Sequence, residues 1–218
     1  MRTVLTVFLF AIVTACNFQP EGFTENEITV AFSQIYIPED SRVYTDFLTQ
    51  KPANGTYQSS YGDGSQRAEV TFENGYAVDG SIWSENGDIK LTFAKESGQY
   101  TQTRYHSNGN RAQKVTFRDG VLGIGNLMSW YEDGNPESEF TPEVIRNWYP
   151  GGQLESEVHY KDEELHGRSA MWHENGQLAG EVFYADGVMH GAYVEWNEEG
   201  NVVSEKEYER GELISESM

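Results

Sequence analysis

The sequence has one cysteine, Cys16, and few basic residues. A single cysteine excludes an intramolecular disulfide framework, so packing must stabilise the fold. Acidic residues number 35 against 15 basic ones, and the net charge is −20. Because such a surface repels phosphate groups, we expect no nucleic-acid partner. A cationic surface or ligand remains open as a partner.

The chain also lacks a hydrophobic run long enough to span a bilayer, which takes roughly 20 apolar residues. Its most apolar stretch, Val4 to Val13, follows Arg2 and ends in small residues, as in a secretory signal peptide. The end of the stretch, VTAC at 13–16, resembles a bacterial lipobox. The resemblance implies that Cys16 is the lipid attachment site and that acyl chains hold the protein on a membrane. The alternative is an ordinary signal peptide cleaved nearby.

The lipobox resemblance gives an expected location in the cell envelope. In lipoproteins of two-membrane bacteria, an Asp after the lipidated cysteine tends to mark retention at the inner membrane. Asn17 stands there instead, which favours the outer membrane. We expect four segments: a lipoprotein signal peptide at 1–15, a polar tether at 16–27, an N-terminal strand or cap segment at 28–50, and a repeat array at 51–218.

Motifs for catalysis, phosphate binding and metal binding are missing as well. The sequence has no Gly-x-Ser-x-Gly, CxxC or HExxH, and the glycine-rich GVLGIG at 120–125 sits at an ordinary repeat turn. His166 and His190 hold equivalent positions one repeat apart, about 9.5 Å in a sheet. Zinc ligands lie about 2.0–2.1 Å from the metal, so this pair needs other donors, and turn-adjacent packing is favoured. We expect no enzyme activity, cofactor or metal.

What the sequence does have is a period of 18 to 25 residues, marked by the glycine that closes each turn. The seven marker glycines are Gly64, Gly87, Gly109, Gly134, Gly152, Gly176 and Gly200. Six repeats carry an aromatic residue four positions earlier, and we predict that these residues form the aromatic core: Trp83, Tyr105, Trp130, Trp148, Trp172 and Trp196. In the first repeat Ser60 stands there, with Tyr61 next to it.

The residues between the turns alternate with a period of two, which indicates strands. In residues 178–184, Leu178, Gly180, Val182 and Tyr184 share one face, against Ala179, Glu181 and Phe183 on the other. The turn pairs Asn-Gly and Asp-Gly, as at 175–176 and 186–187, accept the positive φ of tight hairpins. The pattern predicts an all-β fold, a single-layer antiparallel meander of about seven stacked hairpins.

A glutamate recurs five positions after the marker on the polar face, at Glu69, Glu139, Glu157, Glu181 and Glu205. Two interpretations are open. The glutamates line a groove that binds cations or basic side chains, or they form a solvated face, which is favoured because salt screens charges beyond about 8 Å.

Two stretches, WHENGQLAGEVFYADGVMHG and WYPGGQLESEVHYKDEELHG, resemble MORN-type repeats (membrane occupation and recognition nexus) in their bacterial variant form. The resemblance covers about residues 51–218 and is strongest over 148–211. It implies an array of hairpins that acts as a binding or scaffolding surface. Some bacterial members carry an antitoxin label.

These observations predict a lipid-anchored cell-envelope protein whose repeat sheet binds a protein partner, not yet identified, or scaffolds an assembly, with membrane contact through the N-terminal lipid alone. One alternative is a lipoprotein that binds glycan or peptidoglycan by stacking sugars on surface aromatics. Another, from the family label, is an antitoxin-like inhibitor. Burial of the tryptophans between hairpins would indicate core, and exposure along one groove would favour the sugar-binding alternative.

Overall fold

The structure is a computed structural model that describes residues 31, 35–36, 44–118 and 126–217. Cys16, the signal peptide, the tether and the glycine-rich stretch at 120–125 lie outside the described residues. The chain divides into two units. We call the unit with described residues 31–118 the N-terminal unit and the one with residues 126–217 the C-terminal unit.

The N-terminal unit contains six successive strands of an antiparallel meander: β4 (Gly55–Ser60), β5 (Gln66–Glu73), β6 (Tyr76–Trp83), β7 (Ile89–Glu96), β8 (Gln99–Tyr105) and β9 (Arg111–Arg118). A small sheet precedes them, with β1 (Ile35–Tyr36), β2 (Thr45–Asp46) and β3 (Lys51–Pro52). β1 falls in the stretch at 28–37 that is rich in β-branched and aromatic residues.

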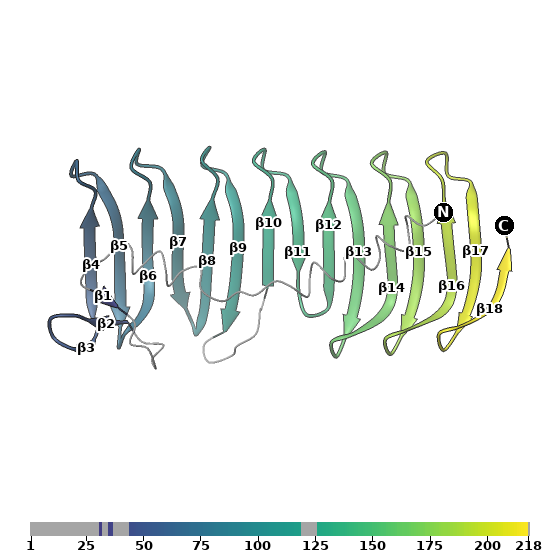
Figure 1. Ribbon diagram of the computed structural model, residues 1–218, viewed down its shortest axis with the longest axis horizontal. Helices are drawn as coiled ribbons and strands as arrows, with labels where there is room; N and C mark the ends of the chain where they lie inside the picture. The colour runs from purple at the N-terminus through teal and green to yellow at the C-terminus, as the bar shows by residue number, and fades with distance from the viewer. Residues whose placement is uncertain (1–30, 32–34, 37–43, 119–125, 218) are drawn as a thin grey trace. The chain divides into compact units, whose positions relative to one another are not determined.

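The C-terminal unit continues the same plan with nine described strands, each paired antiparallel with the next: β10 (Asn126–Trp130), β11 (Pro136–Phe140), β12 (Val144–Trp148), β13 (Leu154–Lys161), β14 (Glu164–Trp172), β15 (Leu178–Ala185), β16 (Val188–Trp196), β17 (Val202–Glu209) and β18 (Glu212–Ser217). Figure 1 shows the strands of each unit following one another in sequence order. The all-β, single-layer meander of hairpins is therefore confirmed.

The meander has one kind of turn at the marker glycines and another kind at the opposite ends of the strands. At the marker glycines the loop has three residues: the N–H of Gly176 donates to the His173 carbonyl at 2.8 Å, and the N–H of His173 donates to the Gln177 carbonyl at 2.8 Å. All seven markers have a positive φ, between 81° and 92°. The residue before each marker has no positive φ, so at Asn175-Gly176 the glycine alone takes the positive φ that the sequence predicted for the pair. These loops are type I turns closed by a left-handed glycine.

At the opposite ends of the strands, five connections among the described residues are two-residue turns in which both residues are left-handed. Asp186 and Gly187 have φ values of 49° and 81°, and they join the paired residues Ala185 and Val188. This is the type I′ turn, whose twist matches that of the flanking strands. The prediction for Asp186-Gly187 is confirmed.

The predicted alternation of faces holds in β5 and β13 and is broken in β15. In β5, Ala68, Val70 and Phe72 are buried. In β15, Gly180 and Val182 are buried as expected, but so is Ala179, which was expected on the polar face. Met171 pairs with Gly180 and Trp172 with Leu178, so Ala179 is the extra residue of a β-bulge, a place that Arg67 takes in β5 and Glu155 in β13.

The His-Gly pairs that recur near the start of hairpins lie at a second bulge. Between the pairs Val182–Tyr193 and Tyr184–Met189, β16 has three residues against one on β15. Gly191 in that segment has a φ of 93°, and Gly167 at the equivalent place in β14 has a φ of 81°. Glycine is needed there because the backbone is left-handed.

The short interval of 18 residues between Gly134 and Gly152 reflects two short strands. β11 and β12 have five residues each, where β13 has eight. Thr141 closes the connection, since its Oγ1 accepts the N–H of Val144 at 3.0 Å. The irregular repeat is thus a shortened hairpin within the same meander.

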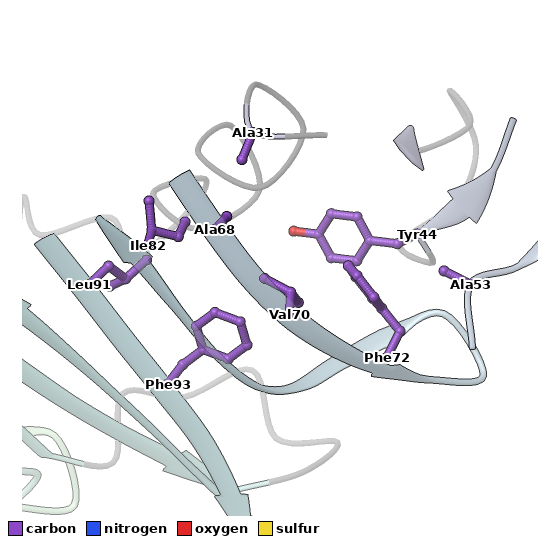
Figure 2. Close-up of a cluster of buried hydrophobic side chains, with 9 residues drawn as sticks. All are labelled: Ala31, Tyr44, Ala53, Ala68, Val70, Phe72, Ile82, Leu91 and Phe93. Atoms are coloured by element: carbon purple, nitrogen blue, oxygen red, sulfur yellow. The ribbon is translucent and has the colours of Figure 1, made fainter. Parts of the chain in front are cut away.

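The main hydrophobic cluster lies in the N-terminal unit, where the segment before the meander covers the first strands (Figure 2). The rings of Tyr44 and Tyr57 approach that of Phe72 edge-on, with centroids 5.2 and 5.5 Å away. The backbone N–H of Tyr44 donates to the Gly75 carbonyl, and that of Gly75 donates to the Ala53 carbonyl, both at 2.8 Å. Described residues of the segment expected at 28–50 as a strand or cap therefore cover this sheet. The buried members of the hydrophobic cluster are Ala31, Tyr44, Ala53, Ala68, Val70, Phe72, Ile82, Leu91 and Phe93.

Candidate binding surface

The six repeat aromatics lie at equivalent places, each as the last residue of a strand before a three-residue loop. All six are half-buried, neither fully enclosed nor fully exposed. Trp172 lies opposite Leu178, and Trp148 opposite Leu154, on the neighbouring strand of the same hairpin. Within each unit the repeat aromatics therefore lie at the strand ends next to the three-residue loops, outside the buried clusters.

Small residues four positions beyond the marker would leave room for a neighbouring tryptophan if the register placed the two opposite each other. The register instead places the residue before the repeat aromatic opposite them. Met171 lies opposite Ser156 and Gly180, and Asn147 lies opposite Ser138 and Ser156. The tryptophan does not lie opposite them, because the bulge next to the aromatic shifts the register by one residue.

Successive repeats are joined by a hydrogen bond that the sequence did not reveal. The hydroxyl of Tyr149 donates to the Trp172 carbonyl at 2.9 Å, and that of Tyr131 donates to the Trp148 carbonyl at 2.8 Å. In the N-terminal unit, Tyr61 makes the same bond to Trp83 at 2.8 Å. We call this contact the repeat link.

A histidine replaces tyrosine in one repeat link, where His173 Nε2 lies 3.0 Å from the Trp196 carbonyl.

In the repeat link of Tyr149, burial raises the pKa of the tyrosine, with Glu155 and Glu174 adding negative charge nearby, so the hydroxyl stays a neutral donor. In the sequence, the residue that forms the repeat link is a Tyr or His directly after the repeat aromatic position.

The polar face of the C-terminal unit contains a half-buried ion triad. Register places Glu139, Arg146 and Glu157 on three adjacent strands. Arg146 Nη1 lies 2.7 Å from Glu139 and its Nε lies 2.6 Å from Glu157. The side chain of Arg146 is 32% exposed, that of Glu139 31% and that of Glu157 19%, so the pairs are partly shielded from water.

Other glutamates of the recurring set have partners too. Glu181 Oε2 accepts from Arg168 Nε at 2.8 Å, and the Arg168 guanidinium lies over the Trp172 ring at 5.7 Å. Glu69 accepts from the side-chain amide of Gln58. Glu205 is exposed. Three glutamates of the set are thus bound by arginines of the chain itself.

Large apolar side chains are exposed mainly at the far end of the C-terminal unit. Six of the ten found among the described residues lie in β15–β18: Phe183, Val188, Val202, Val203, Leu213 and Ile214. The buried cluster of this region is small, with Val182 and Tyr193 at its centre. The sheet there has apolar residues that its own layer does not cover.

His166, one of the two histidines weighed as metal ligands, lies near a carboxylate of the neighbouring turn. His166 Nδ1 is 3.7 Å from Asp186, next to a bulge glycine. In the part of the chain that the structure describes, no group of three or more His, Cys, Asp or Glu side chains is arranged to hold a metal ion. Across the same residues, no helix has the length and apolarity needed to cross a bilayer.

The comparisons with known proteins agree with the hairpin repeats. The family model described as MORN repeat variant matches residues 144–162, 165–186 and 189–216. Residues 144–216 match variant MORN repeats. The first match covers the hairpin β12–β13, the second β14–β15, and the third β16–β18. No curated protein sequence matches the chain.

MORN repeats in general are modules that bind proteins or membranes. The resemblance expected over 51–218 is confirmed over 144–216. The confirmed stretch includes the repeat links of Tyr149 and His173, two members of the ion triad, and the six exposed apolar residues of β15–β18.

Proposed function

We propose that the protein is a lipid-anchored cell-envelope protein whose repeat sheet binds another protein. The observation behind this proposal is the concentration of exposed apolar side chains in β15–β18, on a unit that matches MORN repeats. Exposed apolar patches on folded proteins commonly mark interaction sites.

A photo-crosslinking amino acid placed at Phe183 tests the binding surface. Crosslinking in the native membrane should recover a specific protein. The same amino acid at Tyr76, also exposed but in the N-terminal unit, is the matched control and should recover much less of it. Recovery of no protein at Phe183, together with binding of the chain to isolated cell wall, would support the glycan-binding alternative instead.

The proposed anchor rests on the VTAC sequence at 13–16 and on Cys16 being the single cysteine. Feeding cells an alkyne-tagged fatty acid should label the wild-type protein, and Cys16→Ser should abolish the label and release the protein from membranes. Equal labelling of the variant would contradict the anchor without affecting the proposal of a protein-binding sheet.

A further inference from the structure

The strand β18 forms an edge of the sheet. Within the described residues it pairs with β17 alone, and all six of its residues are exposed. Leu213 is 51% and Ile214 57% exposed. An edge strand presents unpaired backbone groups to which another extended chain can hydrogen-bond.

The edge repeats a contact that joins the preceding hairpins. The N–H of the turn glycine Gly187 donates to the Leu165 carbonyl at 3.0 Å, and the N–H of Gly211 donates to the Met189 carbonyl at 2.8 Å. Leu165 and Met189 are the second residues of β14 and β16, and Leu213 is the second residue of β18. The Leu213 carbonyl is therefore the next acceptor in the same series.

The geometry of the last hairpin turns this carbonyl outward. Arg210 and Gly211 form a two-residue turn, which closes on the pair Glu209–Glu212. In an antiparallel ladder, pairs that exchange hydrogen bonds alternate with pairs that do not. Leu213 pairs with Tyr208 in the second, unbonded position, so its backbone groups point away from β17.

The surroundings of the edge are acidic. Residues 202–217 contain five glutamates and two basic residues. Register places Glu205, Glu207 and Glu209 of β17 on the same face as Glu212 of β18. Lys206 is already paired with Glu216 at 3.2 Å. A second copy of the chain added at this edge would bring the same glutamates, whereas a basic segment would be attracted.

We propose that β18 receives an extended basic segment of the partner protein as an added antiparallel strand. An apolar side chain of the segment lies opposite Leu213, and lysine or arginine lies opposite Glu212, on the face that also carries Glu207. Backbone hydrogen bonds supply the affinity and the alternating side chains supply the specificity. This inference rests on the proposed function in taking the partner to be a protein.

The first test uses a fluorescently labelled peptide of alternating lysine and valine, six residues long, titrated with the full chain. Fluorescence anisotropy should show saturable binding with a dissociation constant of roughly 10–100 µM, because a single short strand buries little area. Methylating alternate backbone nitrogens of the peptide keeps its charge and should weaken binding about tenfold or more. Equal affinity for the methylated peptide, or no binding up to about 1 mM, would overturn the proposal.

The second test locates the site with matched variants. Glu207→Gln with Glu212→Gln should weaken binding about fivefold, as expected for two charge pairs near the surface. Glu198→Gln with Glu199→Gln removes the same charge from the three-residue loop at the other end of the hairpin, where both residues are exposed. A similar loss in both double variants would show that only net charge matters and would refute binding at β18.

Two further outcomes separate the inference from the proposed function. If the chain sediments as a dimer that the peptide dissociates, a second copy occupies the edge and the inference fails. If the peptide does not bind but crosslinking at Phe183 recovers a specific protein, the partner lies on the sheet face; the inference fails and the proposed function stands.

Discussion

The N-terminal and C-terminal units are built from the same hairpin but bury it differently. In the N-terminal unit, Val70, Phe72 and Leu91 have no more than 1% of their surface exposed, under a segment bonded to the Gly75 turn. In the C-terminal unit, the last hairpins leave Phe183, Val203 and Leu213 exposed. The difference shows that the segment before the meander helps the first hairpins to bury large apolar side chains, whereas the last hairpins leave several such side chains exposed.

The capped end should be the more sensitive to loss of a large side chain. Phe72→Ala should lower the free energy of unfolding by about 3–5 kcal/mol, because the ring is enclosed by Tyr44 and Tyr57. Phe183→Ala, the same change at an exposed position, should cost less than about 1 kcal/mol. Urea unfolding of both variants measures the two losses of unfolding free energy, and equal losses would contradict the contrast between the two ends.

A close backbone approach in the N-terminal unit gives the next largest effect. A Cβ at Gly80 would lie 2.6 Å from the Glu69 carbonyl oxygen and 2.8 Å from Phe93 Cζ. Gly80→Ala should therefore destabilise the protein by about 1–3 kcal/mol. Gly62→Ala, where no atom lies within 4 Å, is the control and should change little. A neutral Gly80→Ala in thermal unfolding would mean that Phe93 does not pack over this strand.

The repeat link should matter most where the hydrophobic cluster is small. Tyr149→Phe removes the hydrogen bond to Trp172 and should lower stability by about 1 kcal/mol. Tyr76→Phe, at an exposed side chain without this bond, should have almost no effect. Denaturant unfolding compares the two, and equal small effects would show that the repeat link adds nothing to stability.

The ion triad offers a test of the polar face. Arg146→Gln leaves Glu139 and Glu157 without their shared cation and should cost about 1 kcal/mol, since all three groups are partly solvated. Arg168→Gln, which removes a single partner of Glu181, should cost less. The difference should shrink in unfolding experiments at high salt; a difference independent of salt would point to packing of the arginine chains instead.

The smallest expected effect is a gain in stability, whereas the substitutions above lower stability. Burial, with Glu174 nearby, raises the pKa of Glu155 in the fold. The stability contributed by this group is then greatest in acid and is lost as pH rises through the folded pKa. Glu155→Gln should raise the melting temperature at neutral pH by about 1 °C and leave it unchanged in acid. A lower melting temperature at neutral pH would contradict the direction of the shift.

Strand positions, faces and marker glycines could be predicted because alternation and turn residues are local signals. The β-bulge at Ala179 and the three-residue loop at Asn175-Gly176 could not, since an Asn-Gly pair fits both loop types. The repeat link was missed for a different reason. It joins Tyr149 to a carbonyl 23 residues away, and the pairing depends on how neighbouring hairpins are aligned. The signal of a Tyr or His after the repeat aromatic becomes meaningful only with that register.

The strands of the cap could not be placed from the sequence because residues 41–55 mix turn formers with short apolar stretches. Its strands β2 and β3 have two residues each, too few for an alternating pattern. The cap is held by contacts with residues such as Phe72, which are distant in sequence.

Native-state hydrogen exchange of β5 and β17 tests the contrast between the units most directly, because each strand lies next to an edge strand of its unit. The amides of Ala68, Val70 and Phe72 should exchange at least about tenfold more slowly than those of Glu205 and Glu207. Equal protection, or slower exchange in β17, would contradict the account of a capped end and an open one.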